Sequence, residues 1–204
     1  MGRVILNKRK GQGGVVTEAI ICTQPESPRF DAIPTYKITQ YPLEKRDYKP
    51  FAQAQVCVTP RELAVRLWAF EARPRPASMV EAVFTPRESQ GLLRIRAWAE
   101  GRWECRLLTP GGPREGKPLD AIAHTMAGDD FQGEYWGVSI GLPRRELEGE
   151  LGLALKPGAR LLGNFYKRSR DPEKSHDGSC WPADFAGGRE YGLGSLAVFT
   201  VVDY

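Results

Sequence analysis

Apolar residues recur with a period of two along most of this 204-residue chain, the spacing that side chains have on one face of a β-strand. The clearest case is residues 63–72, LAVRLWAFEA, in which Leu63, Val65, Leu67 and Ala69 share a face. The opposite face is also largely apolar, because it carries a tryptophan and a phenylalanine. A strand that is apolar on both faces is typical of the centre of a sheet, so we expect this run to lie there.

The same period predicts further strands, separated by turn-forming residues. They are residues 16–22, 33–39, 54–58, 79–84, 92–98, 103–108, 133–143, 161–168 and 194–202. The tetrapeptide AEGR, residues 99–102, is expected to close a hairpin. Pro143 can open a short helix over residues 144–151. Residues 110–132 are rich in turn-forming residues and are expected to be irregular, with at most one short helix.

Strands that follow one another at short intervals, with few helical patterns between them, predict an all-β fold. We expect a two-sheet antiparallel β-sandwich of the jelly-roll or immunoglobulin-like type, with one or two short helical turns. A chain of 204 residues can bury one sizeable core but not two comfortable ones. We therefore predict a single domain over residues 15–204, preceded at residues 1–14 by a loose leader or an edge strand.

The composition agrees with a globular protein, since 41% of the residues are hydrophobic and 26% are charged. The net charge of +4 is small, and the basic residues among the first ten positions are expected to form a solvated tail. A second basic group is interpreted as solvated surface, so no nucleic acid is expected as a partner: Arg144, Arg145, Lys167, Arg168 and Arg170. No apolar run reaches membrane-spanning length or resembles a signal peptide, which predicts a cytoplasmic protein without a membrane partner.

The four cysteines are Cys22, Cys57, Cys105 and Cys180, and none of them forms a CxxC pair. Their wide spacing disfavours a zinc site. The first three lie in apolar strand patterns, where a reduced cysteine packs as a small hydrophobic residue. Disulfides are therefore not indicated.

The most unusual stretch is residues 161–185, LLGNFYKRSRDPEKSHDGSCWPADF. It begins as a strand with Leu161 and Phe165 on one face, and then becomes a loop crowded with charged residues. Trp181 follows this loop and precedes a proline that stiffens the chain. A large aromatic residue on a loop, beside groups that can donate and accept hydrogen bonds, predicts a ligand site.

The same stretch would also allow a catalytic pair or a metal site. His176 and Cys180 could act as base and nucleophile, but no oxyanion-stabilising donor accompanies them, and such residues more often stabilise a loop. A metal site from His176, Asp177 and Asp184 is weak, because carboxylates suit calcium whereas the histidine suits zinc. No two carboxylates stand out for glycoside hydrolysis, and His124 is interpreted as a surface residue. We expect no enzyme and no cofactor, and structural calcium is not indicated.

The order of the strands and the segment GNFYK, residues 163–167, followed by Asp171 and by Trp181-Pro182, resembles a known family. From about Gln53 to the C-terminus the chain is similar to the family 9 carbohydrate-binding modules and their stand-alone bacterial relatives, a branch of the DOMON-like β-sandwiches. The resemblance implies a carbohydrate ligand at one end of the sandwich, with Trp181 as a stacking platform. It implies that the sugar hydroxyls are bound by Asn164, Tyr166, Arg168, Asp171, His176 and Asp177.

One segment departs from the family pattern. Sugar-binding members typically carry an aromatic residue and acidic residues just before the strand that matches residues 79–84, whereas this chain has ARPRPASM at residues 72–79. Trp68, Trp103 or Tyr48 would have to replace the missing wall of the site. We expect a non-catalytic carbohydrate-binding protein. The alternative is a structural or protein-interaction sandwich that has lost the sugar, with Trp181 packed as a plug under its loop.

Overall fold

The computed structural model describes residues 18–47, 49–86, 91–113 and 115–204. Strands make up 50% of the described residues and helical turns 8%, so the expectation of a mostly β protein is confirmed. The predicted leader at residues 1–14 and Tyr48 lie outside the described residues. The strands are β1 (Glu18–Thr23), β2 (Tyr36–Ile38), β3 (Phe51–Val58), β4 (Glu62–Phe70), β5 (Ser78–Thr85), β6 (Leu92–Trp98), β7 (Trp103–Leu108), β8 (Lys117–Pro118), β9 (Ile122–Asp130), β10 (Gly133–Pro143), β11 (Arg160–Ser169), β12 (His176–Ser179) and β13 (Ala197–Val202). The helical elements are α1 (Arg144–Leu151) and the 3₁₀ turns Phe30–Ala32 and Leu193–Ser195.

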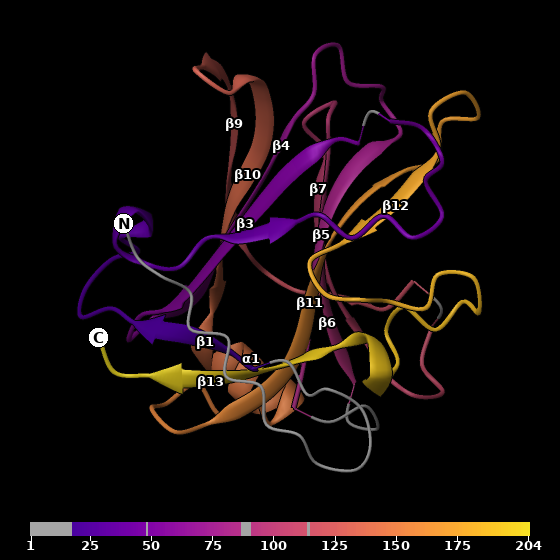
Figure 1. The fold of residues 1–204 in the computed structure, drawn as a ribbon. Coiled ribbons are helices and arrows are strands. Elements are labelled where there is room, and N and C mark those ends of the chain that lie inside the picture. The colour runs from indigo at the N-terminus through magenta and orange to yellow at the C-terminus, as the bar shows by residue number, and fades with distance from the viewer. Residues whose placement is uncertain (1–17, 48, 87–90, 114) are drawn as a thin grey trace.

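Hydrogen bonds join the described strands into one sheet in the order β8-β7-β6-β5-β11-β13-β1-β3-β4-β10-β9, with β12 beside β11 and β2 beside β3. This sheet curls into a half-barrel, so that the half containing β5, β6 and β11 faces the half containing β3, β4 and β10 (Figure 1). The link between the halves is narrow, because β1 pairs with β3 through only Cys22↔Cys57 and Thr23↔Val58. The jelly-roll or immunoglobulin-like connection of a two-sheet sandwich stays a prediction.

The core fills the space between the two halves. The predicted inner face of β4 is buried from Leu63 to Ala69, and β4 lies between β3 and β10 as expected of a central strand. On the facing half, Phe84 and Phe165 lie in the same core and are fully buried. The predicted helix α1 is confirmed, and it buries Leu147 against this core.

The expectation that residues 110–132 are irregular is wrong. This segment contains β8 and the nine-residue strand β9, which pairs with β10 from Gly141↔Ile122 to Gly133↔Asp130. Strand β9 lies at the edge of the sheet and is largely exposed on both faces. Because β9 contributes little beyond Ala123 to the core, its sequence IAHTMAGDD has no alternation of apolar and polar residues. His124 is exposed, as expected, but lies on this strand.

The charged stretch after residue 168 is also more regular than a loop. It turns back as β12, which pairs with β11 in the register Arg168↔Asp177 and Ser169↔His176. Lys167 and Arg168 are therefore not solvated surface, since their relative exposures are 0% and 6%. The strand alternation places them on opposite faces of the sheet, with Lys167 on the same side as the core residue Phe165.

An additional contact closes the half-barrel near β12. The backbone of Gln40 pairs with Ser179 of β12, so the segment after β2 runs beside the β11–β12 hairpin. Residues 41–47 and Pro50 are thereby held against this hairpin at one end of the molecule (Figure 1). Among the helices of the described residues, none has the length and apolar character needed to cross a bilayer.

Candidate functional site

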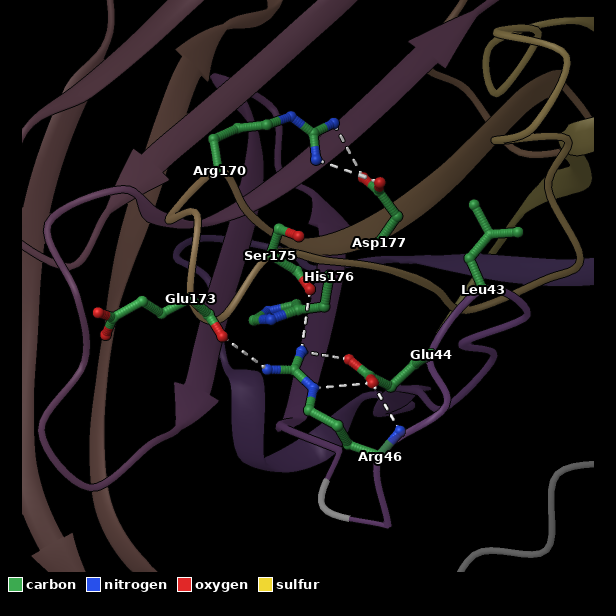
Figure 2. Close-up of a pocket in the computed structure, with 8 residues that line it drawn as sticks. All are labelled: Leu43, Glu44, Arg46, Arg170, Glu173, Ser175, His176 and Asp177. Atoms are coloured by element: carbon green, nitrogen blue, oxygen red, sulfur yellow. Dashed lines mark hydrogen bonds and ion pairs between the residues drawn. The ribbon is translucent and has the colours of Figure 1, made fainter.

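A cleft opens where the β11–β12 hairpin meets residues 41–50 (Figure 2). We call it the Asp177 cleft, and its volume is about 380 Å³. It is lined by Leu43, Glu44, Arg46, Arg170, Glu173, Ser175, His176 and Asp177. Clefts of roughly 300–1,000 Å³ with a few convergent polar groups are typical of small-molecule sites.

Arg46 and Glu44 form one wall of the Asp177 cleft, and Arg46 attaches this wall to the β11–β12 hairpin. Its guanidinium donates to the backbone carbonyl oxygens of Ser175 (2.9 Å) and Glu173 (3.4 Å). Its Nε also donates to Glu44 Oε1 at 2.8 Å, and the two side chains form a two-point ion pair (Figure 2). This pairing lowers the pKa of Glu44 to about 2, so the carboxylate is ionised at neutral pH.

Asp177 forms the opposite wall and is paired with two arginines. Arg170 donates to both of its carboxylate oxygens, at 3.1 and 2.9 Å, and Arg168 Nε donates to Oδ1 at 2.7 Å. Burial alone would raise the pKa of Asp177, but the guanidiniums of Arg170 and Arg168 outweigh it and lower the pKa. The cleft thus presents fixed carboxylates and planar guanidiniums on both sides (Figure 2).

Behind Asp177, the outer face of the sheet carries a buried ionic network. Glu81 of β5 has no exposed surface and is ion-paired with Arg96 of β6 and, at 3.7 Å, with Arg168. Tyr191 donates to Glu81 Oε1 at 2.6 Å, and Glu190 pairs with Arg168 at 3.0 Å. Residues 190 and 191 belong to a segment, 181–195, that packs over this face, and we call it the covering segment.

On the inner face of the hairpin, a second polar cluster surrounds Lys167. Its ammonium donates to Ser78 Oγ at 2.5 Å and to His176 Nε2 at 3.1 Å, and lies 3.2 Å from Glu71 Oε2. Trp136 Nε1 also donates to Glu71, at 3.1 Å. Burial lowers the pKa of Lys167 to about 8, although Glu71 opposes the shift. Burial and the nearby Lys167 lower the pKa of His176 to about 4, so this imidazole is neutral at pH 7.

A smaller cleft lies beside the first and shares the walls formed by Arg46 and His176. We call it the Arg73 cleft, and its volume is about 230 Å³. It is lined by Arg46, Pro50, Glu71, Ala72, Arg73, Arg75, Ser169, Lys174 and His176. It therefore includes part of residues 72–79, the segment that departs from the family pattern.

The fold brings four of the predicted site residues to these clefts. Asp177 and His176 line them, and Arg168 supports Asp177 from behind. Asp171 lies just outside, where its side chain accepts from the backbone N–H groups of Glu173 and Lys174 and so shapes the turn between β11 and β12.

Of the other three predicted residues, Asn164 and Tyr166 lie on β11 under the covering segment, and Trp181 is the first residue of that segment. Asn164 is fully buried and donates to the backbone oxygens of Trp181 and Ser195, at 3.2 and 2.7 Å. Tyr166 is also fully buried, and its hydroxyl donates to the backbone oxygen of Glu190. These contacts hold the covering segment in place, and neither residue lines the two clefts.

Trp181 is half-buried and packs against the core. Its ring lies 5.3 Å from that of Phe199, 5.5 Å from that of Tyr36 and 6.1 Å from that of Phe165, measured between centroids. It lines neither cleft, and neither do Trp68 and Trp103, which were candidates to replace the missing wall.

Sequence reasoning missed Glu44, Arg46 and Glu71. The run at residues 41–51 is charged and has no strand or helix pattern, and no local pattern indicates which of its residues contacts the hairpin. Lys167 could have been recognised, because it lies two positions after the core residue Phe165 and must share its face.

The other chemistries weighed for this stretch are not supported by the geometry. Burial raises the pKa of the Cys180 thiol to about 12, so it lacks the thiolate that a nucleophile requires at neutral pH. Both ring nitrogens of His176 are engaged, by Lys167 and by the Lys174 backbone oxygen. Within the part of the chain that the structure describes, no three metal-ligating side chains come together.

The fold is similar to three solved structures. A proposed carbohydrate-binding protein from Bacteroides uniformis matches with a TM-score of 0.66 and 16% identity, over 90% of this chain and 98% of that chain. A family 9 carbohydrate-binding module from Caldicellulosiruptor kristjanssonii in complex with glucose matches with a TM-score of 0.60 and 9% identity, over 91% and 97%. A family 9 module from the same organism in complex with cellotriose matches with a TM-score of 0.58 and 10% identity, over 92% of this chain and 94% of that chain.

At these identities the likeness concerns the fold alone. No protein-family model matches the sequence, and no curated protein matches it significantly. The resemblance to family 9 modules is therefore supported by structural neighbours rather than by sequence.

Proposed function

We propose that this chain is a non-catalytic carbohydrate-binding protein and that the sugar binds in the Asp177 cleft. The observation that carries the proposal is the arrangement of two ionic pairs, Arg46 with Glu44 and Arg170 with Asp177, around one cleft of about 380 Å³. Carboxylates and planar guanidiniums are the groups that bind neighbouring sugar hydroxyls through paired hydrogen bonds. Both pairs are held by further contacts, so the cleft is preorganised and a ligand orders few side chains.

The structural neighbours support this proposal. The neighbouring family 9 modules have been solved with glucose and with cellotriose, and their fold covers most of this chain. In our proposal Asp177, His176, Arg168 and Asp171 of the predicted set bind or shape the sugar site. Asn164 and Tyr166 act through the covering segment. Stacking of a sugar on Trp181, the DOMON-like assignment and a cytoplasmic location remain predictions.

Calorimetric titration of the protein with a panel of mono- and disaccharides tests the proposal. We expect at least one sugar to bind, and Asp177→Asn to weaken that binding about tenfold or more, because it removes a charged acceptor at the cleft. Glu150→Gln is the matched control, since Glu150 forms an exposed ion pair with Lys117 and lines neither cleft. Absence of binding by every sugar tested would contradict the proposal.

Trp181→Ala separates stacking from packing in the same titration. If the indole stacks on the ligand, the variant should lose affinity even at temperatures where it is folded. If the indole only packs on Phe199 and Tyr36, the variant should lose stability and keep its affinity at temperatures where it is folded.

A second candidate function, a protein-interaction domain, is favoured by a different feature. Phe131, at the turn between β9 and β10, is 95% exposed, and β9 is an open edge strand. Exposed edges and apolar tips are features through which sheets associate. Concentration-dependent self-association in sedimentation experiments, abolished by Phe131→Ser, would support this candidate, and a monomer at all concentrations would count against self-association.

A further inference from the structure

The Arg73 cleft is lined by more positive than negative side chains. Its charged lining residues are Arg46, Arg73, Arg75, Lys174 and the single carboxylate Glu71. Glu71 does not offset these cations at the mouth, because its oxygens are already engaged by the buried ammonium of Lys167, by Ser78 and by Trp136. The side chains at the opening are therefore positively charged.

Two of these cations have no counterion. Arg46 is paired with Glu44, and Arg75 lies 3.2 Å from Glu173 and 3.9 Å from Asp171. Within residues 18–47, 49–86, 91–113 and 115–204, by contrast, the side chains of Arg73 and Lys174 have neither an ion pair nor a hydrogen bond. Two unneutralised cations on the rim of one small cleft give its opening a positive potential that favours an anionic group.

The backbone at Arg73 adds a second observation. Its φ is +56°, a conformation that is uncommon for residues other than glycine, asparagine and aspartate. A long charged side chain is a costly choice at such a position when glycine or asparagine would fit without penalty. The turn thus holds a guanidinium beside the cleft at an energetic cost.

The two clefts are adjacent, since Arg46 and His176 line both of them. A sugar whose ring lies in the Asp177 cleft can therefore extend a substituent into the Arg73 cleft. We infer that the ligand is an acidic carbohydrate, with its hydroxyls bound in the Asp177 cleft and a carboxylate, phosphate or sulfate group bound by Arg73 and Lys174. This inference rests on the proposed carbohydrate-binding function and specifies its ligand class.

Pairs of sugars that differ in one anionic group test the inference. Calorimetry compares methyl glucoside with methyl glucuronide, methyl galactoside with methyl galacturonide, and glucose with glucose 6-phosphate, with inorganic phosphate as a separate titrant. We expect one acidic member to bind about tenfold more tightly than its neutral partner, and this advantage to shrink as salt is added, because charges in an open cleft are screened. Which acidic member binds distinguishes a uronate from a phosphate ligand.

Variants of the rim cations provide the second arm. Arg73→Asn removes the charge while asparagine tolerates the positive φ, so the fold should be retained, and Lys174→Gln removes the other free cation. Each should reduce the advantage of the acidic sugar several-fold and leave the affinity for the neutral sugar unchanged. Lys45→Gln is the matched control, because Lys45 is exposed in the same region and lines neither cleft.

The possible failures are distinguishable. Equal affinity for neutral and acidic partners would overturn the inference and leave the proposed function standing. No binding by any sugar would overturn both. Inorganic phosphate binding as tightly as glucose 6-phosphate, with the same loss in Arg73→Asn, would show an anion site without sugar recognition and would also overturn the inference.

Discussion

Adjacent residues of one hairpin serve two different environments. Lys167 points into the core with Glu71 and Ser78, whereas Arg168 points outward to Asp177 and Glu81. Each charge has a partner on its own face, which is the condition under which a buried charge is tolerated. The strand alternation determines the face on which each side chain lies, and the tertiary fold determines which partner residue it contacts on that face.

The neutral state of His176 makes stability depend on pH. Its folded pKa of about 4 lies below the ordinary value of 6.5, so the unfolded chain binds a proton more readily between these values. The stability contributed by the neutral ring is complete above pH 6.5 and is lost as the pH falls through 4, by up to about 3 kcal/mol. We expect His176→Gln, which keeps one donor and one acceptor but cannot titrate, to be less acid-sensitive in this range.

Urea unfolding at several pH values between 7 and 4 measures this effect. Carboxylates also begin to titrate near pH 4. The quantity to compare is therefore the difference in the free energy of unfolding between parent and variant at each pH, rather than the pH dependence of either protein alone. Equal slopes for the two proteins would contradict the prediction.

The buried pair of Lys167 and Glu71 is expected to couple strongly. Lys167→Met leaves the Glu71 carboxylate without its cation, which should cost about 3–5 kcal/mol in the free energy of unfolding. Adding Glu71→Gln should recover part of this loss, so the double variant is more stable than the sum of the single effects predicts. Urea unfolding of the four proteins gives the coupling energy. Lys117→Met, in an exposed ion pair, is the control and should leave stability nearly unchanged.

At the scale of elements, the site depends on how closely the 41–50 loop approaches β12. Gly178 of β12 lies directly against the ring of Tyr41, and a Cβ at this position would overlap that ring. Tyr41 in turn donates its hydroxyl to the backbone oxygen of Pro50, which fixes the other end of the loop. The absence of a side chain at Gly178 therefore lets Tyr41, and with it the start of this loop, lie close against β12.

Gly178→Ala tests this arrangement. The added methyl group must displace Tyr41, which should cost about 1–3 kcal/mol of stability and weaken sugar binding in the Asp177 cleft. Gly149→Ala in α1 is the control, because a Cβ there meets no atom within 4 Å and alanine favours the helix. Thermal unfolding and titration with the best-bound sugar measure both effects. A Gly178→Ala protein with parental stability and affinity would show that the loop is not held by this contact.

For the whole molecule, the larger of the two core clusters in the described residues includes residues from both halves of the curled sheet. The pairing between β1 and β3 is narrow, but Leu67 of β4 and Phe84 of β5 belong to this same cluster. Shared burial makes the two halves stabilise each other, so we expect one cooperative unfolding transition.

Leu67→Ala and Phe84→Ala test this expectation from opposite halves. Each should lower the free energy of unfolding by about 2–5 kcal/mol and shift a single transition, seen at the same urea concentration by circular dichroism and by tryptophan fluorescence. Two transitions, or a variant that shifts one probe and not the other, would indicate that the halves unfold independently.

The sequence by itself determined the local part of this structure. Period-two alternation in residues 63–69 predicted a strand and its buried face correctly, and the same period predicted the strand at residues 133–143, because burial on one face of a strand imposes that period. Pro143 marked the start of α1 for a similarly local reason. Strand β9 was not predicted, because an edge strand that is largely exposed on both faces needs no alternation of apolar and polar residues. The alternation of β11 also predicted correctly that Leu161 and Phe165 share a face, which is buried.

Only the tertiary structure determined which residues from other parts of the chain contact those faces. The contact of Arg46 with Ser175 joins residues 129 positions apart, and that of Tyr191 with Glu81 joins residues 110 apart. Such pairings depend on the order and curvature of the whole sheet, which no local pattern encodes. The stretch at residues 161–185 therefore indicated where polar groups gather. The curled sheet decided that Trp181 packs on the core while Asp177, Arg170 and Arg46 border a cleft.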